Sequence, residues 1–231
     1  MSKQLLLLSS SRVHGGGYLA HAEREIRELL SGAKRLLFVP YALQDLDGYA
    51  AIARAKFVEL GFEFGSIHEA RDPRQAIEQA EAIFVGGGNT FRLLNRMYEL
   101  DLLDAIGSQV AAGMRYMGAS AGSNLAGPTI KTTNDMPIVQ PPSFNALGLV
   151  PFQINPHYLD ADPTSTHMGE TREQRLREYL EENTVPVVAI REAAMLRVSD
   201  NEVRLLGAKG ARIFQRGRDA YELAPGSIVE L

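Results

Sequence analysis

The chain has 231 residues, of which 45% are hydrophobic and 23% charged, as is usual for a globular protein with one substantial core. Its formal net charge of −4 argues against nucleic acid as the main partner, because phosphate binding needs a basic face. It contains no cysteine, so disulfides, thiolate metal sites and cysteine nucleophiles are excluded.

The four leucines at residues 5–8 form too short a run for a signal-peptide core, and no small-residue cleavage site follows cleanly. They are better explained as a buried first strand. No window approaches the roughly 18 apolar residues of a membrane span. We therefore expect a cytoplasmic protein with no membrane partner.

Short apolar runs alternate with amphipathic segments over residues 1–125. The expected strands cover residues 5–9, 36–39, 62–67, 82–85 and 116–119. The expected helices cover residues 18–30, 47–60, 73–79, 91–100 and 102–112. Because the strands are apolar on both faces and helices separate them, we predict an α/β fold with a mostly parallel sheet covered by helices on both sides.

Regular patterning is weaker in the middle of the chain and returns after it. Residues 127–163 are rich in proline, with one further expected strand at 152–155. A charged helix is expected at 171–182 and an apolar strand at 185–190. Four short runs then follow, at 195–198, 202–206, 211–215 and 220–223, and turn residues between them predict antiparallel hairpins appended to the sheet. We see no repeat or linker, so we predict a single domain over residues 1–231.

The pentapeptide Gly118-Ala119-Ser120-Ala121-Gly122 follows an expected strand and precedes a plausible helix start. That is the context of a nucleophile elbow, in which a sharp turn exposes the serine and the helix N-terminus supplies free N–H groups. The alternative is a tightly packed turn of small residues with no chemical role. The motif alone leaves both readings open.

A second glycine cluster, at residues 86–88 and followed by Asn89, also lies between a strand and a helix. Its N–H groups could complete an oxyanion hole for Ser120 or bind phosphate. It lacks the spacing of the dinucleotide and P-loop motifs, so a nucleotide site is the weaker interpretation. A plain tight turn is the remaining alternative.

A serine nucleophile needs a base, and His157 is the best candidate because it directly follows an apolar run. Catalytic groups of open α/β sheets gather beyond the carboxyl ends of strands, where the glycine cluster, Ser120 and His157 are all expected. His21 and His68 are expected to be solvated. The five histidines of the chain are His14, His21, His68, His157 and His167.

A histidine base must be oriented by an acid, and two carboxylates compete for that role. Asp135 is the only one between Ser120 and His157. Glu192 follows the strand expected at 185–190, and its position favours it as the group behind His157. Asp135 would then bind substrate, support the turn or cap the segment TTNDMP.

The segment at residues 167–175 carries both charges at a helix start. Thr171 and Gln174 have the spacing of a capping box, so a capped surface helix is one interpretation. The other places Arg172 or His167 over the site, where either could hold a substrate carboxylate.

Five blocks in this order resemble the dipeptidase E family of serine peptidases, the α-aspartyl dipeptidases. They are GGGNTFRLL at 86–94, GASAGSN at 118–124, TTNDMPIV at 132–139, QINPHY at 153–158 and GETREQRLREYL at 169–180. The resemblance covers most of the chain and is loosest in the first 80 and last 30 residues.

The resemblance implies a sheet related to that of class I glutamine amidotransferases, hence flavodoxin-like, and a serine peptidase that removes N-terminal aspartate from dipeptides. The family's nucleophile corresponds to Ser120 and its base to His157. Its third catalytic member corresponds to either Asp135 or Glu192. Its oxyanion donors correspond to the backbone N–H groups of Gly88 and Ala121.

An aspartate-specific site needs a cation for the substrate side chain. Arg172 is our first choice, with His167 and Lys131 behind it, and Asp135 or Glu170 would accept the substrate ammonium. The predicted substrate contacts are Arg172, His167, Glu170, Asn89 and Lys131. No metal or cofactor is expected. The expected partner is a small Asp-X dipeptide substrate, and the protein itself is expected to be a monomer or a small homo-oligomer.

Two rival functions stay open at this point. The first is hydrolysis of β-aspartyl-arginine, as in cyanophycinase, a relative with a similar core. The second is a small-molecule-binding module of the same fold that has lost catalysis.

Overall fold

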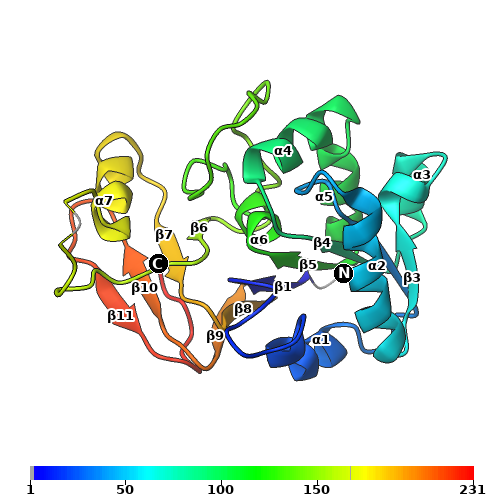
Figure 1. The fold of residues 1–231 in the computed structure, drawn as a ribbon, viewed down its shortest axis with the longest axis horizontal. Coiled ribbons are helices and arrows are strands. Elements are labelled where there is room, and N and C mark those ends of the chain that lie inside the picture. The colour runs from blue at the N-terminus through cyan, green and yellow to red at the C-terminus, as the bar shows by residue number, and fades with distance from the viewer. Residues whose placement is uncertain (1–2, 167) are drawn as a thin grey trace.

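The computed structural model describes residues 3–166 and 168–231, and it contains two β-sheets surrounded by helices (Figure 1). The main sheet has seven strands in the order β3-β2-β4-β5-β1-β8-β9. Its strands are β1 (Gln4–Leu8), β2 (Arg35–Val39), β3 (Glu63–Ser66), β4 (Ala82–Val85), β5 (Arg115–Ala119), β8 (Ala194–Ser199) and β9 (Glu202–Gly207). The strands from β1 to β5 pair in parallel, whereas β8 and β9 run antiparallel to their neighbours.

Helices cover both faces of the main sheet because successive strand residues point to opposite sides. Leu5 and Leu7 of β1 belong to one core cluster, and Leu6 and Leu8 belong to the other. Figure 1 shows α4 and α6 on one side of β1 and β5 and α1 on the other. The helices are η1 (Ala20–Ala22), α1 (Glu23–Leu29), α2 (Leu46–Glu59), η2 (Ile67–Glu69), α3 (Pro73–Glu78), α4 (Thr90–Glu99), α5 (Leu103–Ala111) and α6 (Ala121–Leu125).

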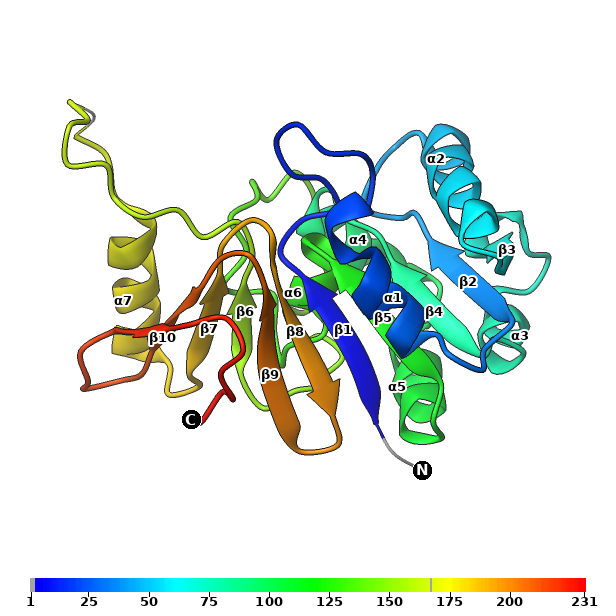
Figure 2. The ribbon, with the colours of Figure 1, turned by 90° about the horizontal axis from the view of Figure 1, so that it is seen from below.

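A second sheet of four strands, ordered β11-β10-β7-β6, lies beside the main one (Figure 2). Its strands are β6 (Gln153–Asn155), β7 (Val187–Ile190), β10 (Ala211–Phe214) and β11 (Tyr221–Leu223), and its outer helix is α7 (Arg172–Glu182). Val188 and Ile190 join the core cluster of the main sheet, while Val187 and Ala189 pack against α7. The core is therefore continuous between the two sheets.

The predicted fold class is confirmed: the chain is α/β, with a mostly parallel sheet, helices on both faces and antiparallel strands near the C-terminus. One detail differs from the prediction. The hairpin of β8 and β9 extends the main sheet, but β10 and β11 join β7 and β6 in a separate sheet. All four residues of β7 are buried, and the strand has hydrogen-bonded neighbours on both edges.

Within the ranges given above, no helix has both the length and the apolar character that crossing a membrane requires.

Candidate active site

Ser120 lies on a strained turn between β5 and α6. Its backbone has φ 51° and ψ −109°, a combination that side-chain-bearing residues rarely adopt. The turn is held on both sides, because the Ser120 N–H donates to the Leu8 carbonyl and its carbonyl accepts from the Asn124 N–H. The strain directs the hydroxyl away from the sheet at the carboxyl end of β5.

Glycines are required on both sides of Ser120 by close backbone contacts. A Cβ at Gly122 would lie 2.1 Å from the Val85 carbonyl oxygen, and one at Gly118 would lie 2.5 Å from the Gly122 carbonyl oxygen. These contacts agree with the interpretation that the glycines allow tight packing of the turn. The same packing also presses the turn against β4 and fixes the direction of the serine.

His157 follows β6 and reaches the serine from the second sheet. Its Nε2 lies 2.9 Å from the Ser120 Oγ, and the residue has a positive φ of 53°. Its N–H donates to the Ser9 Oγ, which in turn donates to the Ile190 carbonyl. Ser9 is fully buried directly after β1, so its hydroxyl links the carboxyl ends of β1, β6 and β7. Its position directly after the leucine run is the feature of the sequence that could have identified it.

The two competing carboxylates occupy different places. Glu192 Oε1 lies 3.2 Å from His157 Nδ1. Asp135 Oδ2 instead accepts from the Thr90 N–H at 2.7 Å, the Thr90 hydroxyl at 2.6 Å and the Thr133 hydroxyl at 3.2 Å. Asp135 thus fastens its loop to the first turn of α4.

The glycine loop before α4 presents a free N–H group beside Ser120. The Gly87 N–H donates to the Tyr49 hydroxyl, and the Asn89 N–H donates to the Ala42 carbonyl. Within the described part of the chain, the N–H groups of Gly88 and Ala121 have no acceptor. Gly88 has φ 138°, which favours glycine at this position.

Asn89 supports this loop. Its Oδ1 accepts from the Arg92 N–H and so caps α4, while its Nδ2 donates to the Met136 carbonyl. Together with Asp135, Asn89 ties the segment around residues 133–136 to the start of α4. Sequence reasoning missed Tyr49, whose contact with Gly87 depends on how α2 packs on the sheet.

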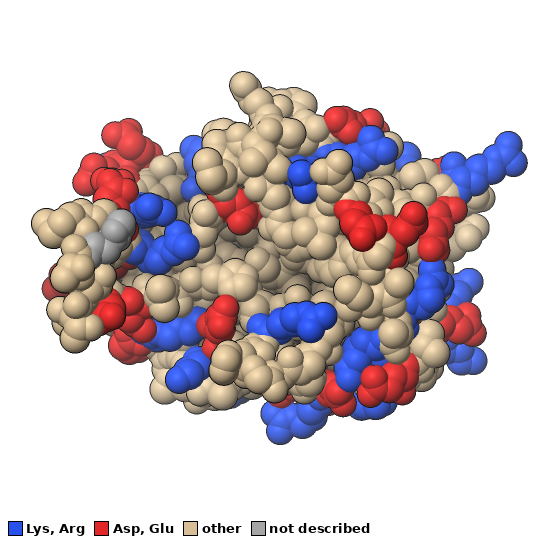
Figure 3. Space-filling model, in the orientation of Figure 1, with Lys and Arg blue, Asp and Glu red and all other residues tan. Residues whose placement is uncertain are grey.

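Two cavities meet at the serine. The larger, of about 680 Å³, is lined by Arg12, Tyr18, Leu43 and Glu192 among others, and the smaller, of about 210 Å³, by Asn124, Thr133 and Arg172 among others. Ser120, Asp135 and His157 line both cavities. Figure 3 shows the face hollowed near its middle, with charged groups of both signs around the hollow.

Among the described residues that line the smaller cavity, Arg172 supplies the positive charge. Burial lowers the pKa of its guanidinium, Arg175 acts in the same direction, and Asp135 opposes both. The group stays charged at any ordinary pH, because a guanidinium is too strong a base to lose its proton in a protein. A partly desolvated cation in a small cavity is suited to bind a carboxylate.

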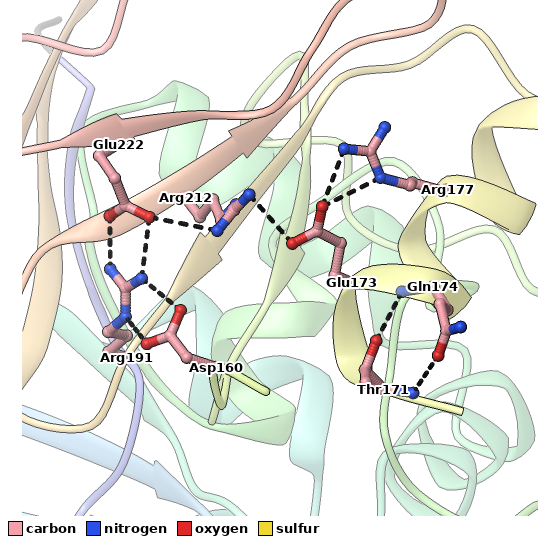
Figure 4. Close-up of polar contacts among 8 residues, drawn as sticks. All are labelled: Asp160, Thr171, Glu173, Gln174, Arg177, Arg191, Arg212 and Glu222. Atoms are coloured by element: carbon pink, nitrogen blue, oxygen red, sulfur yellow. Dashed lines mark hydrogen bonds and ion pairs between the residues drawn. The ribbon is translucent and has the colours of Figure 1, made fainter. Parts of the chain in front are cut away.

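A network of ion pairs connects the residues next to Glu192 and Arg172 in the sequence, Arg191 and Glu173, to neighbouring strands (Figure 4). Arg191, next to Glu192, donates to Asp160 at 2.6 Å and to Glu222 at 2.8 Å. Glu173, next to Arg172, accepts from Arg212 at 3.0 Å and from Arg177 at 2.8 Å. The network joins α7 to β10, β11 and the end of β7.

The remaining predicted contacts are not brought to these cavities. Lys131 donates to the Asn183 side chain at 3.1 Å, and Glu170 pairs with Arg175 at 3.5 Å. Neither lines the larger or the smaller cavity, although Glu170 lines a third cavity together with Arg172, and their contact with substrate stays a prediction. His167 lies outside the described residues.

The site thus has a serine on a strained strand-to-helix turn that is hydrogen-bonded to a histidine, which in turn is hydrogen-bonded to a carboxylate. This arrangement is characteristic of serine hydrolases. No group of three or more His, Asp or Glu side chains in residues 3–166 and 168–231 is arranged to hold a metal ion.

Comparison with known proteins shows to which family of serine hydrolases the chain belongs. The model of peptidase family S51 matches residues 5–206. Peptidase E of Streptomyces coelicolor is 55% identical over 96% of this chain and 92% of its own length, and a probable alpha-aspartyl dipeptidase of Drosophila melanogaster is 49% identical over 97% and 95%. This chain belongs to peptidase family S51.

Solved structures agree with the fold. A peptidase from an acI-B1 actinobacterium superposes with a TM-score of 0.73 at 18% identity, covering 100% of this chain and 98% of the other. A putative peptidase E from Listeria monocytogenes gives 0.69 at 23% identity, covering 90% and 100%.

Proposed function

We propose that this protein is a serine dipeptidase that hydrolyses dipeptides with an N-terminal aspartate through an acyl-enzyme on Ser120. The observation that carries the proposal is the 2.9 Å distance from the Ser120 Oγ to His157 Nε2 on a turn with φ 51°. Membership of peptidase family S51 and relatives named peptidase E and alpha-aspartyl dipeptidase supply the reaction and the substrate class.

In the proposed reaction, the Ser120 Oγ attacks the peptide carbonyl while His157 Nε2 takes the hydroxyl proton. The N–H groups of Gly88 and Ala121 donate to the oxyanion that forms. His157 then gives the proton to the leaving amine, and the C–N bond breaks. His157 then takes a proton from water as the water attacks the ester carbonyl. The ester C–O bond breaks, His157 returns the proton to the Ser120 Oγ, and aspartate is released.

Glu192 is proposed to orient His157 and stabilise its charged form, since its Oε1 lies 3.2 Å from Nδ1. Asp135 is proposed to position the oxyanion loop, because its three hydrogen bonds go to Thr90 and Thr133 rather than to the imidazole. Asp135 also lines both cavities, which leaves it available as an acceptor for the substrate ammonium.

Arg172 is proposed to bind the side-chain carboxylate of the substrate aspartate in the smaller cavity. A volume of about 210 Å³ suits one small residue, and Arg172 supplies the needed positive charge. Asn89 is proposed to act indirectly, through the position of Gly88.

The test is a panel of Asp-Leu, Glu-Leu, Asn-Leu, β-Asp-Arg and a p-nitrophenyl ester with the purified protein. We expect turnover of Asp-Leu well above that of the other substrates. Ser120→Ala is expected to lower kcat by about 10³-fold or more, and Arg172→Met to reduce the preference for Asp-Leu over Asn-Leu. Unchanged turnover in Ser120→Ala, or none on any Asp-X dipeptide by the unmodified protein, would overturn the proposal.

The rivals are less well supported. Preferred cleavage of β-Asp-Arg would indicate a cyanophycinase-like enzyme, and absence of all turnover would indicate a binding module. The single domain, the cytoplasmic location and the monomer or small homo-oligomer stay predictions.

A further inference from the structure

A second arginine, Arg12, lines the larger of the two cavities at Ser120, whereas Arg172 lines the smaller one. We propose that Arg12 binds the α-carboxylate of the second residue of the dipeptide and so restricts the enzyme to substrates that end there. The inference rests on the proposed function and adds to it a residue that determines substrate length.

Arg12 has the properties of a residue that binds a carboxylate. It belongs to the loop between β1 and η1, is exposed, and is the one cation among the described residues that line the larger cavity. Its guanidinium has no ion pair or hydrogen bond with any described residue, and it stacks on the Tyr18 ring with its Cζ 5.6 Å from the centroid. The ring holds the cation in place without neutralising it.

The groups around Arg12 leave its charge available. Tyr18 packs edge-on against Tyr49, with 6.5 Å between the ring centroids. Burial raises the pKa of both phenols, so neither carries a negative charge near neutral pH. The two carboxylates of the same cavity contact other groups, Glu192 contacting His157 and Asp135 contacting Thr90, and neither forms an ion pair with Arg12. A substrate carboxylate could therefore bind Arg12 without displacing a carboxylate of the protein from it.

The arrangement of the two cavities matches the charges of an Asp-X dipeptide. Since Ser120 and His157 line both, the scissile bond lies where the cavities meet. The aspartyl part occupies the chamber with Arg172, and the leaving residue occupies the chamber with Arg12. Figure 2 shows the loop after β1 (blue) and the segment before α7 (yellow-green) rising from the same edge of the molecule, apart from one another.

The same chamber offers apolar surface for the side chain of the second residue. Leu43 and Ile52 line it and are 38% and 45% exposed. An apolar second residue would cover them while its carboxylate reaches Arg12. Asp-Leu is for this reason the substrate for the test.

The experiment compares Asp-Leu with its C-terminal amide, Asp-Leu-NH₂, which differs only in lacking the negative charge. We expect the unmodified protein to favour the free acid in kcat/KM by about tenfold or more, since a charge-assisted hydrogen bond is lost with the amide. In Arg12→Gln, the ratio of acid to amide is expected to fall towards one through a higher KM for Asp-Leu. Arg12→Lys should recover part of the ratio.

Lys34→Gln is the matched control, because it removes a positive charge just before β2, at the amino-terminal ends of the parallel strands, whereas Ser120 follows the carboxyl end of β5. Its ratio should equal that of the unmodified protein. An unmodified protein that cleaves acid and amide equally well, or an Arg12→Gln variant with an unchanged ratio, overturns the role of Arg12 while leaving the dipeptidase activity in place. Failure of the unmodified protein to cleave either substrate overturns the proposed function and this inference with it.

Discussion

Ser66, His68 and Asp47 form a hydrogen-bonded chain of the same residue types as a catalytic triad, yet nothing suggests that it reacts. The Ser66 Oγ lies 2.7 Å from His68 Nδ1, and His68 Nε2 lies 3.0 Å from Asp47. Ser66 is 3% exposed, has ordinary extended dihedrals and ends the edge strand β3, three places from β5 in the sheet. At the scale of residues, a reactive serine is therefore marked by its strained turn, open cavity and free N–H donors more than by its neighbours.

Removing the charge of Glu192 tests its role behind His157. Glu192→Gln is expected to lower kcat by about tenfold, less than the roughly 10²-fold or more that a group transferring the proton itself contributes, because the side chain is 59% exposed and water can replace it. The Tm should not change. Asp135→Asn is the comparison: it removes the negative charge that strengthens the hydrogen bonds from Thr90 and Thr133, so both kcat and Tm should fall. Equal kcat for Glu192→Gln and the unmodified enzyme would contradict the assignment.

His21 provides a prediction about pH and stability. It was expected to be solvated, but both ring nitrogens are buried without partners, and burial lowers its pKa. As pH falls below about 6.5, the unfolded chain takes up a proton that the folded state resists, so stability is lost. His21→Leu should raise the Tm, by more at pH 5.5 than at pH 7.5, as measured by calorimetry. A gain independent of pH would contradict this.

At the scale of elements, the join between β5 and α6 depends on glycine. Gly122→Ala would drive a Cβ to 2.1 Å from the Val85 carbonyl, which should cost about 2 kcal/mol or more and reduce activity. Gly107→Ala in α5 is the control, since nothing lies within 4 Å of its Cβ. That change should stabilise by about 0.5–1 kcal/mol. Urea unfolding measures both, and equal effects would refute the packing argument.

The predicted capping box at the start of α7 is confirmed: Thr171 accepts from the Gln174 N–H, and Gln174 accepts from the Thr171 N–H. Thr171→Ala should cost about 1 kcal/mol and also raise KM for Asp-Leu, because the helix begins at Arg172. Asp72→Ala removes a comparable cap from α3, away from the cavities. It should lower the Tm with KM unchanged. A KM effect of equal size in both variants would show that the cap does not act through Arg172.

At the scale of the whole molecule, the shared core predicts one cooperative unfolding transition. Ile83 in β4 and Ile213 in β10 are fully buried in the same cluster, although they lie in different sheets. Ile83→Ala and Ile213→Ala should each cost about 3 kcal/mol and shift the same calorimetric peak. A second peak that moves in only one variant would indicate two domains.

The strands and helices were largely predictable from the sequence, because the pattern of apolar residues and turn signals is local information. The strand at 82–85 and the helix at 73–79 differ from the observed β4 and α3 by no more than one residue. The choice of sheet for β10 and β11 was not predictable, since strand pairing depends on which buried edge is free in three dimensions.

The same division applies to the site and to the protein as a whole. The peptidase family, the parallel α/β sheet and the strand ends at which Ser120, His157 and Glu192 lie could be predicted from the sequence, because motifs and periodicity are local features of the chain. Three facts came from the three-dimensional packing alone: Glu192 faces His157, Lys131 and Glu170 do not line the two cavities at Ser120, and Arg12 lines the larger of these. Those facts depend on distances between segments far apart in sequence, which packing fixes and local pattern does not.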